Sequence, residues 1–168
     1  ALRPDLKIVD IRGNVDTRLN KMHEQKLDGI VLAAAGLKRL HMESVITQYL
    51  STEEMIPAAA QGTLAIELRR EDRELLSMVN AFSDEKAQRI AQTEREFLQR
   101  IGGDCHLPIG AYASILADGQ IRLQALFGDA DGEHLAQCDV CGNEPESLAA
   151  AAVQQLKVCK IRVCRAQI

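Results

Sequence analysis

Three short strand-like segments, separated by Asp-Gly dipeptides, constrain the fold of this chain more than any other feature. They span residues 109–117, 120–127 and 134–141. Asp-Gly between apolar runs is a strong signal for a tight hairpin turn, and it occurs here at 118–119 and 131–132. A helical pattern follows at 146–156. Residues 83–168 are therefore predicted to form a small α+β domain with a three-stranded antiparallel sheet.

The first half of the chain has a different pattern, in which apolar runs alternate with helical segments. The runs lie at residues 7–11, 29–34 and 63–68, and the helical patterns at 15–26, 43–50 and 72–82. Continuous apolar runs predict strands of a buried parallel sheet, and their alternation with helices predicts α/β layers. Pro57 and the small residues through Gly62 interrupt this pattern. We expect an incomplete α/β layer, because so few strands cannot close a core.

A long helix is predicted to connect the two halves. It begins with Ser83 as its N-cap and ends at Gly102, since glycine is the usual residue just beyond a helix. The charged run Glu94-Arg95-Glu96 on this helix is interpreted as solvated surface. The last segment, residues 157–165, is basic and alternates in the manner of an edge strand.

Composition excludes several classes of function. Twenty basic and 24 acidic residues give a net charge of −4, and there is no Trp, so we expect no nucleic-acid partner. The longest apolar run, residues 30–37, is too short to cross a bilayer, so no membrane partner is expected. No signal peptide is visible, which predicts a cytoplasmic protein whose five cysteines are reduced thiols.

Three arginines lie at or just after the ends of the predicted strands. Arg12 follows the first strand, Arg18 lies one turn into the next helix, and Arg39 follows the second strand. Ligands of open α/β sheets bind at the carboxyl ends of strands, and a guanidinium matches a carboxylate bidentately. One interpretation is a pocket for a polycarboxylated anion, and the other is three solvated surface arginines. Spacing alone favours the interpretation as solvated surface arginines.

Cys105 lies in the glycine-containing segment 102–110, after the long helix and before the sheet. Such a cysteine can be a nucleophile, a covalent attachment point or a metal ligand, or only a small apolar filler. A protease-like Cys–His pair with His106 is disfavoured, because adjacency in sequence does not make a catalytic pair.

Four other cysteines suggest a rival, zinc-binding interpretation. Cys138 and Cys141 form a C-x2-C pair, and Cys159 and Cys164 follow in the tail. A non-catalytic anion-binding module is a second rival, and a covalent group on Cys105 would distinguish it from an enzyme.

Several motifs in one order carry a resemblance to a known family. They are RGNVDTRL at 12–19, IVLAAAGLKRL at 30–40, PAAAQG at 57–62, TEREF at 93–97 and the Cys105 segment. In these motifs the chain resembles the hydroxymethylbilane synthases (porphobilinogen deaminases), from Arg3 to about Leu156. Departures are Asp104 and Ala60, at positions where the family often has glycine.

The resemblance implies a transferase of tetrapyrrole biosynthesis. Cys105 matches the cysteine that carries a dipyrromethane cofactor through a thioether. Arg12, Arg18 and Arg39 match arginines that hold acidic groups of the cofactor, of porphobilinogen and of the growing oligopyrrole. Gln61 matches a glutamine in the segment that links the second domain to the first. The family is also expected to be monomeric, with no metal.

The resemblance further implies a domain organisation. Residues 1–56 correspond to part of a second, periplasmic-binding-protein-like α/β domain. Residues 57–82 cross back toward the first domain, and residues 83–168 form the cofactor-carrying C-terminal domain. The aspartate regarded as the general acid in the family has no counterpart in these 168 residues. We therefore expect no catalytic residue in this chain, and little or no deaminase activity from it alone.

Overall fold

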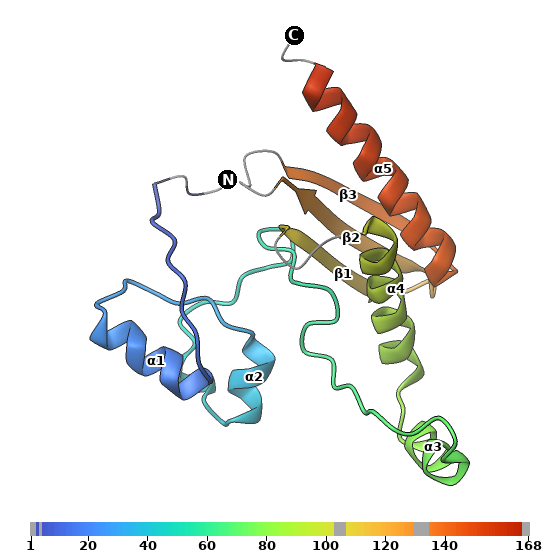
Figure 1. The fold of residues 1–168 in the computed structure, drawn as a ribbon, viewed down its shortest axis with the longest axis horizontal. Coiled ribbons are helices and arrows are strands. Elements are labelled where there is room, and N and C mark those ends of the chain that lie inside the picture. The colour runs from blue at the N-terminus through green and yellow to red at the C-terminus, as the bar shows by residue number, and fades with distance from the viewer. Residues whose placement is uncertain (1–2, 4, 103–106, 130–134, 166–168) are drawn as a thin grey trace. The chain divides into compact units, whose positions relative to one another are not determined.

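The computed structural model describes residues 3, 5–102, 107–129 and 135–165, the last seven of them as helix backbone only. By internal packing the chain divides into two compact units, Ala1–Tyr49 and Leu50–Ile168. Figure 1 shows the course of the chain through both units.

The second unit contains a three-stranded antiparallel sheet of β1 (Ile109–Ile115), β2 (Ile121–Gly128) and β3 (Leu135–Gly142), in that order. Ala113 lies opposite Leu123, which in turn lies opposite Val140. The predicted three-stranded sheet is confirmed. The first Asp-Gly forms the expected turn, with Gly119 at φ +84°. The second, at 131–132, lies outside the described residues.

Two helices cover one face of this sheet. They are α4 (Glu85–Ile101) and α5 (Pro145–Arg165), which pack against each other and against the strands (Figure 1). Alternate strand residues point to that face, because side chains of a strand alternate in direction. The buried core comprises Phe97, Ile101, Ala111, Ala113, Ile121, Leu123, Ala125, Cys138, Leu148, Ala149, Ala152, Val153 and Leu156.

The ends of α4 follow from its sequence. Asp84 is the N-cap, and its carboxylate accepts a hydrogen bond from the Ala87 N–H at 2.8 Å. The predicted cap, Ser83, was therefore wrong by one residue, because the carboxylate is the group that reaches the free N–H of the first turn. Gly102 ends the helix in the left-handed conformation, φ +67°, as predicted.

The first unit contains α1 (Val15–Glu24), α2 (Ala34–Arg39) and a single 3₁₀ turn, η1 (Glu43–Val45). The prediction of α1 with Asn14 as N-cap is confirmed. The helix predicted over residues 43–50 is not formed beyond its first turn, so that prediction was wrong. Val45, Ile46 and Thr47 are three consecutive β-branched residues, which lose side-chain freedom in a helix.

The strands predicted at 7–11, 29–34 and 63–68 are not formed among the described residues. The first and third segments, and residues 29–33 of the second, are neither helix nor strand and have no strand partner. Their apolar side chains stay exposed: Ile8 is 85% exposed, Val31 64% and Ile66 67%. A strand needs a neighbour to satisfy its backbone groups, so an apolar run alone does not make one.

The tail expected as an edge strand is instead the last part of α5, which runs to Arg165. An isolated basic strand would leave its backbone groups unpaired, whereas the helix satisfies them within one segment.

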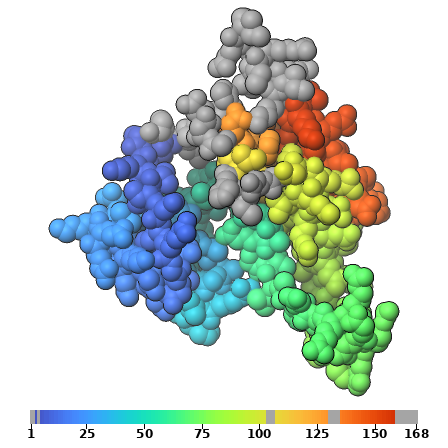
Figure 2. Space-filling view, viewed as in Figure 1, coloured from blue at the N-terminus to red at the C-terminus, as the bar shows by residue number. Residues whose placement is uncertain are grey.

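A further helix, α3 (Arg73–Ala81), precedes α4 and is capped by Asp72. It lies in the green region at the lower right of Figure 2. Leu75, Met78 and Phe82 are exposed there, Phe82 to 91%. Among the described residues, no helix is both long and apolar enough to span a membrane.

Replacing Phe97 tests the core directly. Phe97 is fully buried beneath the sheet, so Phe97→Ala is expected to lower the free energy of unfolding by about 3–5 kcal/mol in urea titrations. Phe82→Ala is the matched control and should change the same free energy by less than about 0.5 kcal/mol. Equal losses in the two variants would contradict the packing described.

Candidate functional site

A tight turn before α1 carries the first motif. Asn14 accepts a hydrogen bond from the Thr17 N–H at 2.8 Å through its side chain, which fixes the start of the helix. Arg18 donates from Nε to the Gly13 carbonyl at 2.7 Å, and Lys21 donates from Nζ to the Arg12 carbonyl at 2.9 Å. Two basic side chains of α1 therefore hold the turn that precedes it.

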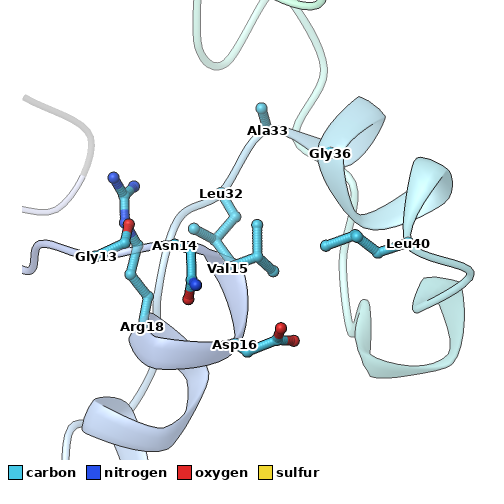
Figure 3. Close-up of a pocket in the computed structure, with 9 residues that line it drawn as sticks. All are labelled: Gly13, Asn14, Val15, Asp16, Arg18, Leu32, Ala33, Gly36 and Leu40. Atoms are coloured by element: carbon cyan, nitrogen blue, oxygen red, sulfur yellow. The ribbon is translucent and has the colours of Figure 1, made fainter.

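This turn and the start of α2 border a hollow of about 480 Å³ (Figure 3). It lies wholly within the first unit. Its lining residues are Gly13, Asn14, Val15, Asp16, Arg18, Leu32, Ala33, Gly36 and Leu40. On both edges a non-helical segment leads into a helix, α1 or α2, whereas the sequence predicted a strand before each helix. The N-terminus of α1 also lies at this edge, and the partial positive charge of a helix N-terminus favours anions.

The structure brings only one of the three predicted arginines to the hollow. Arg18 lines it, and its guanidinium lies beside Gly13 in Figure 3. Arg12 is exposed in the preceding turn and Arg39 is exposed at the last position of α2, and neither is a lining residue. Asp16 also lines the hollow and adds a negative charge that an acidic ligand must avoid.

Sequence reasoning missed Ala33 and Gly36, the small residues on the α2 side of the hollow. Their signal was the run of small residues over 33–36 ahead of a short helix. Small side chains at these positions leave room for a ligand.

Gly13 is the residue on which the turn depends. Its φ is +131°, and a Cβ added there would lie 2.8 Å from Cγ2 of Thr17. No L-residue with a side chain fits that backbone and that space.

Gly13→Ala is expected to open the turn and to lower the stability of α1 by about 1–3 kcal/mol. The Arg18 Nε–H signal in NMR spectra reports the bond to the Gly13 carbonyl and should lose its protection from exchange. Gly29→Ala is the control, because nothing lies within 4 Å of a Cβ at Gly29. An unchanged Arg18 signal in Gly13→Ala would refute this role of the glycine.

A second motif segment forms a turn in the second unit. The Gln61 N–H donates to the Ala58 carbonyl at 3.1 Å, and the Thr63 N–H donates to the Ala60 carbonyl at 3.1 Å. The Gln61 residue is exposed. Ala60 has φ +58°, the left-handed region that favours glycine over residues with a side chain.

Ala60→Gly is expected to raise the free energy of unfolding by up to about 1 kcal/mol, because it removes the left-handed strain of a residue with a Cβ. Ala58→Gly, two residues earlier in the same turn, should lower it slightly through greater freedom of the unfolded chain. Thermal unfolding of both variants measures this, and a loss in Ala60→Gly would contradict the assignment.

Cys105, the predicted attachment point, lies outside the described residues. The described residues around it are Gly102, which ends α4, and Leu107, which precedes β1.

The zinc interpretation of Cys138 and Cys141 is not supported. Cys138 is buried, with its thiol donating to the Ala152 carbonyl at 3.7 Å, whereas Cys141 is exposed. Residues three apart on a strand point to opposite faces, so β3 cannot present both thiols to one ion. Within the described part of the chain, no group of three or more potential ligands is placed to hold a metal.

Two family models match the chain in order. Residues 1–77 match the model "Porphobilinogen deaminase, dipyromethane cofactor binding domain", and residues 89–157 match "Porphobilinogen deaminase, C-terminal domain". The chain belongs to the porphobilinogen deaminase family. The resemblance found in the sequence motifs is thereby confirmed.

Curated relatives agree with this assignment. The porphobilinogen deaminase of Lachnospira eligens is 47% identical over 157 residues, which cover 92% of this chain and 53% of that protein. That of Clostridium acetobutylicum is 47% identical, covering 84% and 47%. That of Brevibacillus brevis is 40% identical, covering 93% and 50%. The chain spans about half the length of the curated relatives it matches.

Proposed function

We propose that this chain is part of a porphobilinogen deaminase, a transferase of porphyrin and heme biosynthesis. Such an enzyme joins four porphobilinogen molecules head to tail, with loss of ammonia, and releases hydroxymethylbilane. The observation that carries the proposal is the match of both parts of the chain, in the same order, to the two family models.

The residues of the first unit suit an acidic pyrrole ligand. Arg18 lines the hollow, and so do Asn14 and Val15 at the start of α1. These features fit the acetate and propionate groups of a dipyrromethane cofactor and of porphobilinogen. Arg12 and Arg39 are proposed to hold further acidic groups, and Cys105 to hold the cofactor through a thioether. Bound in this way, the cofactor supplies the primer to which pyrrole units are added.

The roles of these side chains follow from their chemistry. A guanidinium keeps its proton at all relevant pH values, so the arginines bind and orient but do not transfer protons. Cys105 serves as a tether and does not turn over. Loss of ammonia needs an acid that protonates the leaving amine, and no residue of this chain is assigned that role.

We also propose the domain organisation implied by the family. Residues 1–56 belong to a periplasmic-binding-protein-like α/β domain, residues 57–82 lead back toward the first domain, and residues 83–168 carry the cofactor. Support comes from the alternation of apolar non-helical segments with helices over 7–39 and from the helix-covered sheet after residue 83.

Attachment to Cys105 is tested by intact-mass measurement on chain produced in cells that make porphobilinogen. The wild-type chain and Cys141→Ala are expected to carry a covalent dipyrrole and to give the pyrrole colour reaction. Cys105→Ala should have its unmodified mass and give no colour. Cys141 is the matched control because it is an exposed free thiol. A dipyrrole on Cys105→Ala, or its loss from Cys141→Ala, would contradict the proposal.

A further inference from the structure

The sequence placed Glu94 on solvated surface, and the structure shows that this was wrong. Glu94 lies on α4 and is only 5% exposed. Its carboxylate accepts two backbone hydrogen bonds, Oε2 from the Ala60 N–H at 2.6 Å and Oε1 from the Ala113 N–H at 2.7 Å. One side chain therefore joins three segments: helix α4, strand β1 and the turn that contains Gln61.

The two donors belong to one continuous arrangement along the outer edge of β1. The Ala111 N–H, two residues before Ala113, donates to the Pro57 carbonyl at 2.9 Å. Residues two apart on a strand direct their N–H groups to the same side. Gly110 lets the segment approach closely, since a Cβ there would lie 3.0 Å from the Ile56 and Pro57 carbonyl oxygens. The segment at Ile56 and Pro57 therefore covers the outer edge of β1 at Ala111, and the Glu94 carboxylate covers it at Ala113.

Chemical complementarity explains why a carboxylate occupies this position. Two backbone N–H groups need two acceptors, and an ionised carboxylate offers one oxygen to each without bringing a donor. A glutamine of the same size would turn an NH₂ group toward one of the two N–H groups.

Burial raises the pKa of Glu94, and the hydrogen bonds from Ala113 and Ala60 act in the opposite direction. No charged side chain among the described residues contributes to this shift.

We propose that Glu94 is a positioning residue whose carboxylate fixes the turn at residues 57–61, and with it Gln61, to β1 and α4. This role deepens the proposed function, in which that turn links the cofactor-carrying part to the rest of the enzyme. The hydrogen bonds themselves do not depend on the cofactor.

The test is a pH titration of the complete 168-residue chain, followed by its amide signals in NMR spectra. The amide protons of Ala60 and Ala113 are expected to titrate together, with one pKa above the ordinary value for glutamate. In Glu94→Gln this shared transition should vanish. Hydrogen exchange at Ala60 should also accelerate about tenfold or more, as expected when a hydrogen bond to a charged group is lost.

Glu96→Gln is the matched control on the same helix, because Glu96 pairs with Arg100 at 3.3 Å and not with the turn. It should leave both amide titrations unchanged. Exchange at Leu123 in the core should stay within about twofold in Glu94→Gln, because a positioning role affects the turn and not the global fold.

Separate titrations of the two amides, or none, would overturn the proposal. The proposal would also be overturned if hydrogen exchange at the Ala60 amide were unchanged in Glu94→Gln, or if exchange accelerated equally at Ala60 and Leu123. If Glu94→Gln does not fold, the titration of the wild-type chain decides alone. Dipyrrole attachment at Cys105 is measured by mass, so a failure of that function is distinguishable from a failure here.

Discussion

The packing of α4 and α5 against one face of the three-stranded sheet is the contact on which the described fold depends. Three strands with one apolar face are about the smallest sheet that is stable when a helix covers it. Phe97 and Leu156, from the two helices, are fully buried against Leu123 and its neighbours. The elements before and after Cys105 in the sequence belong to this layer, since α4 ends at Ile101 and β1 begins at Ile109.

The same constraint explains why the first part of the chain looks different. Segments 7–11 and 63–68, and residues 29–33, have strand-like composition, but they find no pairing partner among the described residues. Strand pairing requires hydrogen bonds between two segments, whereas the hydrophobicity that predicts a strand is read from one segment alone. Leu37 is the one buried apolar residue among the described residues of the first unit. The hollow beside Arg18 is therefore held by local hydrogen bonds at Gly13 and Asn14 and not by a large core.

Sequence reasoning succeeded where the signal was local. The turn at Asp118-Gly119, the Asn14 cap and the Gly102 stop are each decided by one or two residues, and all three are present. The turn signals and strand-like runs that predicted β1, β2 and β3 are also local signals.

Sequence reasoning failed where the local structure depends on segments that are distant in the sequence. The unpaired runs of the first half are one example. Glu94 is another, since its sequence neighbours Arg95 and Glu96 suggest surface while its partners lie 34 residues before and 19 residues after it. For the site, the motif predicted Arg12, Arg18 and Arg39 as ligands of acidic groups, and it could not show that Arg18 lines the hollow while Arg12 and Arg39 lie outside its lining.

Hydrogen exchange of the whole chain, read by mass spectrometry of its peptides, tests the central claim that the helix-covered sheet is the only closed core among the residues that the structure describes. Peptides covering residues 121–128 are expected to exchange slowest. Peptides covering 29–33 and 63–68 should exchange at rates close to those of an unstructured chain. Protection at 29–33 equal to that at 121–128 would show that this segment is a paired strand, and it would contradict the account.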